Sequence, residues 1–455
     1  MINRIRPAIA PSYLLLCLLL GGSPQGAWGN AILQLLAVAI IAWALIEWRS
    51  DALPRIARQL LVIVALAVSI ALIQLVPLPA SIWTSLPGRE FVVQGFRLLG
   101  IGWPAMPLSL APYDGLATLL AILPPLGMLA AIIGLRAYSA MWLAAALIAG
   151  AMAGVLLGAL QVSSPAPEAS PWYLYRYSNF GVATGFFANS NHMANLLLVT
   201  IPFIAAVGVT VRERSKDMRM RTAGLAVAIS GLVLAALGLI LNQSLAGYGL
   251  GVPVLLASLT ILFGLSASWA RGALVATGLT GIAAIALLWG SPIRSQMEGL
   301  GVSTSVTSRQ QIVTNSLALA SDFAPVGSGL GTFPAIYAMV ENPATVGRVY
   351  VNHAHNDYLE LAVETGIPGI AIIVLFLAWW GAAVLRMLKS PASDQFALAG
   401  AIASAAILLH SLVDYPLRTA AISAVFAMSL ALIIQSRRTA RSEKDLRPTR
   451  HLVVD

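Results

Sequence analysis

Two histidines and a run of polar residues stand out in a strongly apolar chain, in the segment VNHAHNDYLELAVETGIPG (351–369). A neutral imidazole can accept a proton from a hydroxyl group or orient it for attack, so His353 and His355 are candidates for general-base chemistry. The alternative is that both side chains only make hydrogen bonds within a loop. Paired histidines with Asp357 would also suit zinc, but no third cluster of ligands is evident in the sequence, so we predict no metal.

The same segment carries the signals of a helix start and a helix stop. Asp357 is followed three residues later by Glu360, which is the spacing of a capping box. We therefore predict a short helix over 358–365 with Gly366 as its C-cap and Pro368 in the first turn of the next helix. The positive end of this helix would disfavour a protonated imidazole just before it and would favour a nearby anion.

Two further groups of polar residues lie next to apolar stretches. In the segment GFFANSNHMANLLL (185–198), Asn189 is placed to cap a helix, while Asn191 and His192 either line a polar cleft or pack against neighbouring helices. His410 and Asp414 lie near the end of another apolar stretch, where a structural pairing of the two side chains is the favoured interpretation.

The elements that position these residues are transmembrane helices. The chain has 455 residues, of which 58% are hydrophobic and 10% are charged, and its mean hydropathy is +0.84. Soluble domains average about 25% charged residues, so these charges are too few to cover a water-facing surface. The sequence predicts an all-α polytopic membrane protein with about twelve spans of roughly 20 residues each: 8–22, 27–48, 56–76, 113–135, 138–161, 190–211, 222–241, 246–266, 271–290, 366–388, 395–413 and 418–435.

The distribution of basic residues predicts the orientation. With the N-terminus in the cytoplasm, 20 of the 27 Lys and Arg residues fall on the cytoplasmic side and seven on the far side. The net charge of +9 thus reflects topology, and we predict no nucleic-acid partner. The longest extramembrane stretches, 77–112, 162–189 and 291–365, then lie on the far side, and the last of these should carry short helices. A cleavable signal peptide is the alternative interpretation of the first span.

Three segments resemble the O-antigen ligase and polysaccharide polymerase family. His355-Asn356, nine residues and then Gly366-Ile367-Pro368-Gly369 match the pattern H-[NSQ]-x9-G-x-x-[GTY] of that family. The segment 185–198 resembles the opening of a span in the middle of the family's chains, and SRQQIVTNSLALASDFAPVGSGLGTF (308–333) resembles its arginine-led helix and Gly-rich turn. The resemblance covers residues 185–435. Residues 1–184 are similar only in being hydrophobic, and 436–455 form a basic cytoplasmic tail that we expect to be disordered from 438.

The resemblance implies an inner-membrane glycosyltransferase without a cofactor. Such an enzyme transfers a glycan from undecaprenyl diphosphate to an acceptor hydroxyl on the periplasmic side, and the acceptor is lipid A core or a growing polysaccharide. His355 would be the catalytic residue. A cation must stabilise charge on the leaving diphosphate, a task that suits arginine. The candidate diphosphate- and substrate-binding residues are Arg309, Arg176, Arg348, Asn356, Asn191 and His192.

One position departs from the family pattern. The family has a Ser-Arg pair in the loop before its eighth span, and this chain has LNQSLAGYG (241–249) there, with Leu245 at the position of the arginine. Either Arg176 or Arg348 substitutes for it, or phosphate binding is weaker, or the substrate differs.

Several functions remain open at this stage. Ligase, polymerase and protein O-glycosyltransferase would share the donor and the histidine motif, and we place ligase first. A transporter or a lipid flippase is the alternative from another class, but carriers of that kind usually bury charges within their spans, and the predicted spans contain almost none. The Gly-rich stretch 327–331 follows no predicted strand and opens no βαβ unit, so we expect a turn there instead of a nucleotide-binding loop.

Overall fold

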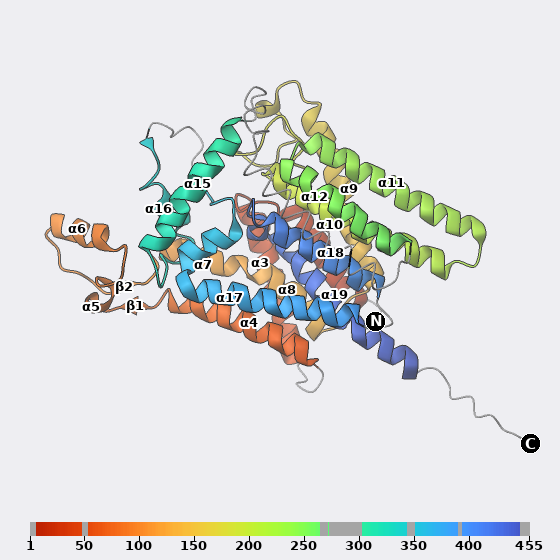
Figure 1. Cartoon of the computed structure of the whole chain (residues 1–455), viewed down its shortest axis with the longest axis horizontal. Helices are drawn as coiled ribbons and strands as arrows, with labels where there is room; N and C mark the ends of the chain where they lie inside the picture. Colours follow the sequence, from red (N-terminus) through yellow and green to blue (C-terminus); the bar gives the residue numbers. More distant parts are fainter. Residues whose placement is uncertain are drawn as a thin grey trace, which may run out of the picture.

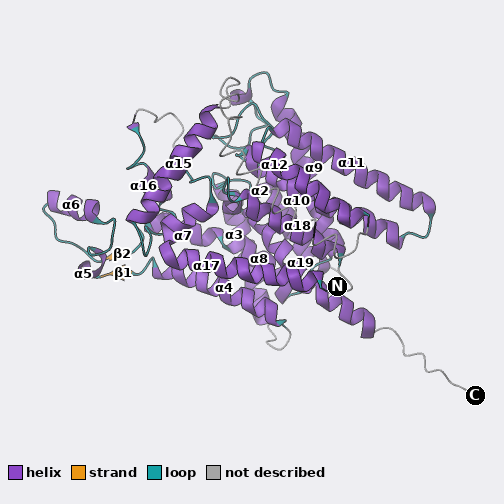
Figure 2. Ribbon diagram, in the orientation of Figure 1, coloured by secondary structure: helices purple, strands orange, loops and turns teal. Residues whose placement is uncertain are grey.

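The regular structure of this protein is almost entirely helical. The computed structural model describes residues 6–47, 53–263, 272, 303–343, 351–389 and 394–445. Among them the only sheet is one antiparallel pair, β1 (Pro77–Leu78) with β2 (Met106–Pro107), in which Pro77 pairs with Pro107 and Leu78 with Met106. The predicted all-α class is confirmed (Figure 2).

Eight helical segments in the described residues are long and apolar enough to cross a membrane. They are α3 (Ala27–Ile46), α4 (Arg55–Ile73), the stretch Pro112–Gly134 made of α7 (Pro112–Ala121), α8 (Leu123–Leu129) and η3 (Ala130–Gly134), α9 (Ala140–Val162), α10 (Ser190–Arg214), α11 (Met218–Asn242), α12 (Leu245–Leu262) and α17 (Asp357–Leu388). Each corresponds to a predicted span.

Three shorter apolar helical segments correspond to three further predicted spans. They are Arg6–Leu20, made of η1 (Arg6–Ala8) and α2 (Ile9–Leu20), then α18 (Gln395–His410), and the Ala420–Gln435 part of α19 (Ala420–Asp445). The remaining predicted span, 271–290, lies outside the described residues except at residue 272, so the count of twelve stays a prediction. The helix α19 continues to Asp445, so the segment 438–445 is helical where the sequence predicts disorder (Figure 1).

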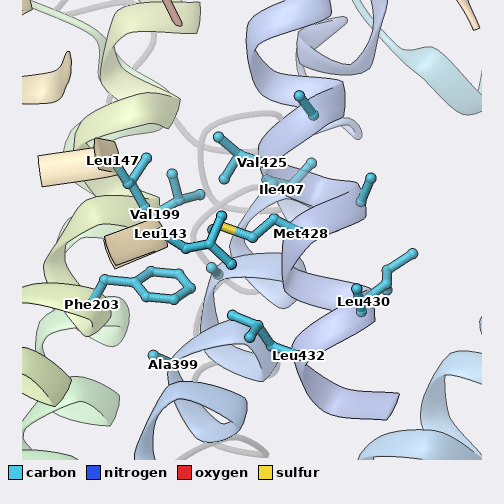
Figure 3. Packing of buried hydrophobic residues seen from close by; sticks show 14 of the residues in the cluster. Leu143, Leu147, Val199, Phe203, Ala399, Ile407, Val425, Met428, Leu430 and Leu432 are labelled. Carbon is cyan, nitrogen blue, oxygen red and sulfur yellow. The ribbon is translucent and has the colours of Figure 1, made fainter. Parts of the chain in front are cut away.

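Helix α10 forms the centre of the bundle. It is apolar around most of its circumference, which is the pattern of a helix that is surrounded by others, and it packs against α9, α11, α12 and α18. In the core, Val199 and Phe203 of α10 lie near Leu143 of α9 and Ile407 of α18 (Figure 3). The first helix, α2, belongs to the same core, because Leu14 and other side chains on one face of it are fully buried.

Smaller elements lie outside this bundle, in the stretches predicted to be extramembrane loops. Residues 77–112 carry α5 (Ala80–Trp83) and α6 (Glu90–Leu98), and residues 162–189 carry η4 (Pro167–Ala169). The long stretch 291–365 carries α15 (Ser303–Asp322) and α16 (Phe333–Tyr337), which bears out the expectation of helices there. A last short turn, η6 (Pro416–Arg418), joins α18 to α19.

Successive helices begin at alternate ends of the bundle, as expected for consecutive membrane spans. The N-termini of α10 and α12 meet where the hydroxyl of Ser244 donates to the side-chain oxygen of Asn191 (2.7 Å). At the other end, the C-terminal part of α10 meets the start of α18, where the amide of Gln395 donates to Glu213 (3.1 Å). The polar residues singled out from the sequence lie at the first of these ends.

Candidate functional site

The histidine motif leads directly into α17, and Asn356 caps this helix. The Asn356 side-chain oxygen accepts the backbone N–H groups of Tyr358 and Leu359, both at 3.0 Å, and its amide donates to the Leu412 carbonyl (3.0 Å). The predicted capping box of Asp357 and Glu360 is therefore wrong. An asparagine is an equally good N-cap, and it releases both carboxylates for contacts with a distant part of the chain.

The predicted break at Gly366 is confirmed. Gly366 has φ +60° and ψ −147°, so α17 is in effect two helices joined at this residue, and Pro368 falls in the first turn of the second. A side chain at 366 would place its Cβ 2.2 Å from the carbonyl oxygen of Pro325. Only glycine combines this backbone conformation with so close an approach.

The Gly-rich stretch 327–331 is a turn that packs against this kink. The backbone N–H groups of Ser328 and Gly329 donate to the carbonyls of Val363 (3.1 Å) and Glu364 (2.8 Å), and that of Gly331 donates to the Glu364 carboxylate (2.9 Å). These donors are occupied by α17, so they are not free to bind a nucleotide phosphate, in agreement with the prediction of a turn.

A buried arginine from another loop braces the same turn. Arg89 donates to the carbonyls of Leu108 (2.7 Å) and Gly327 (3.2 Å) and lies over the ring of Phe323. Burial lowers the pKa of Arg89 to about 10. These bonds join the stretch 77–112 to the turn that supports α17.

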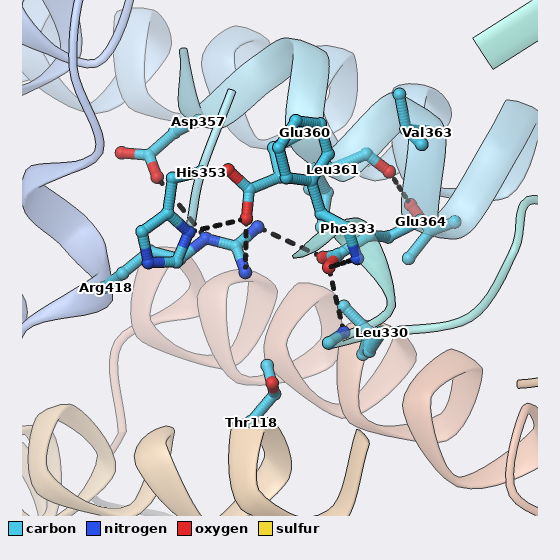
Figure 4. A network of polar contacts seen from close by, with 12 residues as sticks. Thr118, Leu330, Phe333, His353, Asp357, Glu360, Leu361, Val363, Glu364 and Arg418 are labelled. Carbon is cyan, nitrogen blue, oxygen red and sulfur yellow. Dashed lines mark hydrogen bonds and ion pairs between the residues drawn. The ribbon is translucent and has the colours of Figure 1, made fainter. Parts of the chain in front are cut away.

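Arg418 holds three carboxylates on one face of α17 (Figure 4). Asp357, Glu360 and Glu364 have the spacing i, i+3, i+7, which places them on the same side of a helix. The guanidinium lies 3.1 Å from Glu360, 3.1 Å from Glu364 and 3.7 Å from Asp357. Burial alone would lower the pKa of Arg418, but these carboxylates raise it, so Arg418 stays charged and fixes η6 against the start of α17.

His353 belongs to this network. Its Nδ1 lies 2.8 Å from Oε1 of Glu360, and Oε2 of Glu360 accepts the backbone N–H of Ala354 (2.8 Å). The loop before α17 is thereby fixed to the helix that follows it. His353 is mainly a structural group in this arrangement.

His355 makes a different contact, with Asp414. Its Nδ1 lies 3.2 Å from Oδ1 of Asp414, which is completely buried. A carboxylate on Nδ1 selects the tautomer with hydrogen on Nδ1 and leaves Nε2 as the proton acceptor. Nε2 of His355 makes no hydrogen bond to a described residue. The pair is therefore an Asp-His dyad with one nitrogen available.

The backbone at His355 has an unusual conformation. Its φ is +49°, in the left-handed region that non-glycine residues adopt infrequently, although histidine does so more than most. Strain of this kind is worth about 1–3 kcal/mol and persists where the surroundings over-determine the geometry. Here the capped helix on one side and the anchored His353 on the other hold the residue. In this conformation the imidazole is directed toward Asp414.

The Asp414 carboxylate has three donors. Besides His355, the amide of Asn189 approaches it at 3.3 Å and the backbone N–H of Tyr415 donates to it at 2.9 Å. Burial alone would raise the pKa of Asp414, but the hydrogen bond and charge of His355, with further contributions from His192 and Arg309, lower it well below its usual range. Asp414 is therefore an ionised group inside the protein.

Tyr415 lies among three imidazoles. Its ring centroid is 4.0 Å from that of His353, 4.9 Å from His192 and 5.1 Å from His355. Burial and the charge of Asp414 raise the pKa of the Tyr415 phenol well above its ordinary value, so the ring stays neutral and spaces the histidines apart.

Arg309 contributes positive charge to the same region from α15. Its charge acts on Asp414, and its side chain is half-buried. Within the described part of the chain, the guanidinium has no ion pair and no hydrogen bond. A cation that is near a buried site and has no protein partner there is available for an anionic ligand.

Within the described part of the chain, several buried polar atoms near the dyad have no hydrogen-bond partner. They are Nε2 of His192, both side-chain polar atoms of Asn195 and both ring nitrogens of His410. The favoured pairing of His410 with Asp414 is wrong, because Asp414 turns toward His355 and Asn189. Buried polar groups are normally satisfied, so this unsatisfied set marks a polar interior where water or a ligand hydroxyl has partners.

The other predicted site residues are not part of the contact between His355 and Asp414. Asn189 caps α10, as predicted, and Asn191 accepts the bond from Ser244, so Leu245 begins α12 beside the site. Arg176 is exposed and lies over the ring of Tyr177. Arg348 is outside the described residues. Where described, no three His, Cys, Asp or Glu side chains converge as metal ligands, since Asp357 faces Arg418 and not the histidines.

Sequence reasoning assigned no role to Tyr415 and Arg418, and it assigned Asp414 the wrong partner, His410. They lie in the segment HSLVDYPLR (410–418), a cluster of polar and aromatic residues between two apolar stretches. This composition could have marked the segment as part of a site. It could not show the partner of each side chain, because the partners lie about 50–60 positions earlier in the chain.

The comparison with known families gives one match over the middle of the chain. Residues 180–374 match the family model described as O-antigen ligase. The match includes the α10 segment, Arg309 and the histidine motif, and it confirms the resemblance stated from the sequence. A search of curated proteins found no match. The protein is thus a membrane protein in which residues 180–374 are similar to O-antigen ligase, and its apolar helices agree with that class.

Proposed function

We propose that this protein is an inner-membrane glycosyltransferase of the ligase type, which transfers a glycan from undecaprenyl diphosphate to an acceptor hydroxyl on the periplasmic side. The observation that carries the proposal is the dyad of His355 and Asp414, in which no described residue pairs with Nε2 of His355, together with Arg309, whose guanidinium likewise has no partner among the described residues. The family match supports the reaction class.

In the proposed step, Nε2 of His355 accepts the proton of the acceptor hydroxyl as its oxygen bonds to the anomeric carbon. The bond between that carbon and the diphosphate oxygen breaks, and the electron pair stays on the diphosphate. Asp414 stabilises the imidazolium that forms, and Arg309 stabilises the charge on the leaving group. The proton then passes from the imidazolium to water or to the released diphosphate, which returns His355 to its starting state.

The remaining predicted residues have supporting roles in this proposal. Asn356 and Asn191 position the site through the helix ends that they fix, and His192 offers its unpartnered Nε2 to a substrate hydroxyl. Arg309 takes the role of the family's arginine, whose position Leu245 occupies in this chain. Arg176 and Arg348 are secondary candidates for the diphosphate or for the glycan phosphates.

We propose that the catalytic unit spans residues 185–435, although the family match ends at 374. Asp414 and Arg418 lie beyond that limit in the sequence, yet Asp414 contacts His355 and Arg418 contacts Glu364 of α17. Residues 1–184 would form the supporting helices. Residues 436–455 would form a cytoplasmic extension.

The orientation part of the proposal follows from the distribution of basic residues. A reporter that is active only in the periplasm should be active when fused after residue 340 and silent when fused after residue 216. Activity after residue 216 would reverse the assigned orientation and place the dyad on the cytoplasmic face.

Surface polysaccharide from a deletion strain distinguishes the functions. Full-length glycan chains stranded on the lipid carrier at the periplasmic face indicate the ligase that we propose, with lipid A core as acceptor. Single repeat units on the carrier would contradict it and indicate a polymerase that acts on a growing polysaccharide. Carrier-linked glycan held at the cytoplasmic face would instead indicate a flippase, and loss of glycan from proteins alone would indicate a protein O-glycosyltransferase.

A further inference from the structure

A second feature of the bundle lies at the end opposite the dyad. Helices α4 and α17 run side by side (Figure 1), and the indole N–H of Trp379 donates to the carbonyl of Ile56 (3.0 Å) where they meet. Beside this contact is a groove of about 610 Å³. It is separate from every residue assigned to the proposed function.

The rim of the groove is basic. Arg55 and Arg58, in the first turn of α4, and Arg386, in the last turn of α17, line it, and all three side chains are exposed. Within the described part of the chain none of the three has an ion pair, and no Asp or Glu lines the groove. Three guanidinium groups around one opening favour an anion, and phosphate matches their planar donors.

The rest of the groove is apolar. Val62, Leu375 and Ala378 are exposed along it, and the buried Trp379 forms part of its wall. Leu375 is 11 residues before Arg386, which is about 16 Å along a helix. The apolar surface thus extends from the basic rim toward the middle of the bilayer, which is the arrangement needed for a phosphate head group with acyl chains attached.

The position of the groove excludes the diphosphate of the proposed donor as its occupant. From Pro368, just after the kink near the dyad, to Arg386 is 18 residues, or about 27 Å of helix, which is close to the thickness of the hydrocarbon core. A head group at the rim therefore lies in the opposite leaflet from a substrate at His355.

We propose that this groove is a binding site for an anionic phospholipid of that leaflet, with its phosphate on Arg55, Arg58 and Arg386 and its acyl chains along the apolar wall. Basic pockets between transmembrane helices bind such head groups in the leaflet that faces the positive side of a membrane protein. The bound lipid would add a further connection between α4 and α17, a helix pair of which α4 is largely unburied along its length.

Lipid retention by the purified full chain tests this site. Native mass spectrometry in detergent, with cardiolipin, phosphatidylglycerol or phosphatidylcholine added in turn, should show that the first two bind at least tenfold more tightly than the third. The preference should disappear in the triple variant R55Q/R58Q/R386Q. A matched control removes three exposed arginines from the α10–α11 turn, at the same end of the bundle, where binding should stay unchanged: R212Q/R214Q/R219Q.

A second variant tests the apolar part without a change in charge. A378F should fill the wall of the groove and weaken binding of both anionic lipids while the arginines stay in place. The proposal is overturned if the arginine variant keeps the preference, if wild type does not distinguish phosphatidylcholine from the anionic lipids, or if added undecaprenyl diphosphate is the ligand that the arginine variant loses. The measurement is independent of transfer activity, so it stands or fails separately from the proposed function.

Discussion

Replacement of Asp414 by asparagine isolates the electrostatic part of the dyad. The change keeps the size of the side chain and removes its charge. Three donors, from His355, Asn189 and the backbone of Tyr415, converge on the carboxylate. An amide offers one acceptor oxygen and two hydrogens, so at least one of these donors loses its acceptor. The negative charge that stabilises the imidazolium is lost in every orientation of the amide.

The expected loss of turnover follows from the role of that imidazolium. General-base assistance is worth ~10²–10⁴-fold in rate, or about 3–5 kcal/mol of barrier at 1.36 kcal/mol for each factor of ten. Because His355 remains present but is no longer supported by a charge, Asp414→Asn should lower turnover by ~10²–10⁴-fold. The affinity for the lipid-linked donor should change little, since Asp414 is completely buried.

The assay is transfer from a lipid-linked glycan to its acceptor by the purified protein in nanodiscs. Asp394→Asn is the matched control. Asp394 caps α18 at the other end of the bundle, where asparagine is an equally good cap, so activity should stay at the wild-type level. Thermal unfolding in detergent separates lost chemistry from lost fold. Turnover within threefold of wild type in a stably folded Asp414→Asn protein would refute the dyad.

Three further outcomes are expected. Arg309→Ala should raise the barrier to transfer by ~2–4 kcal/mol, as for loss of one oxyanion donor. Arg309→Lys should recover only part of the lost turnover. Wild-type turnover in the alanine variant would mean that Arg309 is only a surface charge. Arg418→Gln should destabilise the protein by ~3–5 kcal/mol, because the buried Glu360 and Glu364 and the partly buried Asp357 lose their counter-ion, and a normal unfolding temperature would contradict this. Transfer should persist in a chelator; activity lost there and restored by zinc or magnesium would promote the two histidines as metal ligands.

The sequence predicted those features that depend on neighbouring residues. Apolar stretches of bilayer length located the described spans, and the pair Gly366 and Pro368 located the kink in α17, because a left-handed residue followed by a proline is a local signal. The likeness of the motif at His355 to a known family identified the segment that contributes His355 to the candidate site. The cap of α17 was assigned one residue too late, since Asn356 and Asp357 are both good capping residues.

The features that sequence reasoning missed depend on contacts between distant segments. Asp414 is 59 residues from His355, and Arg418 is 54 residues from Glu364. No periodicity links such positions. A buried carboxylate gave no indication of whether its partner was His410 four residues away or a histidine from another helix. The contact between the end of α18 and the start of α17 decides this: the carbonyls of Leu412 and Leu408 accept hydrogen bonds from the side chains of Asn356 and Tyr358.

The measurement that tests the central claim most directly is the transfer activity of His355→Ala beside that of His353→Ala. Both changes remove the same side chain from the same loop, yet His353 pairs with Glu360 in the supporting network, and only His355 presents a free nitrogen next to Asp414. Purified and reconstituted with a lipid-linked glycan donor, the His355 variant should fold normally and show no detectable transfer, while the His353 variant should be less stable and retain measurable transfer. Transfer by a folded His355→Ala protein at the wild-type rate would contradict the account.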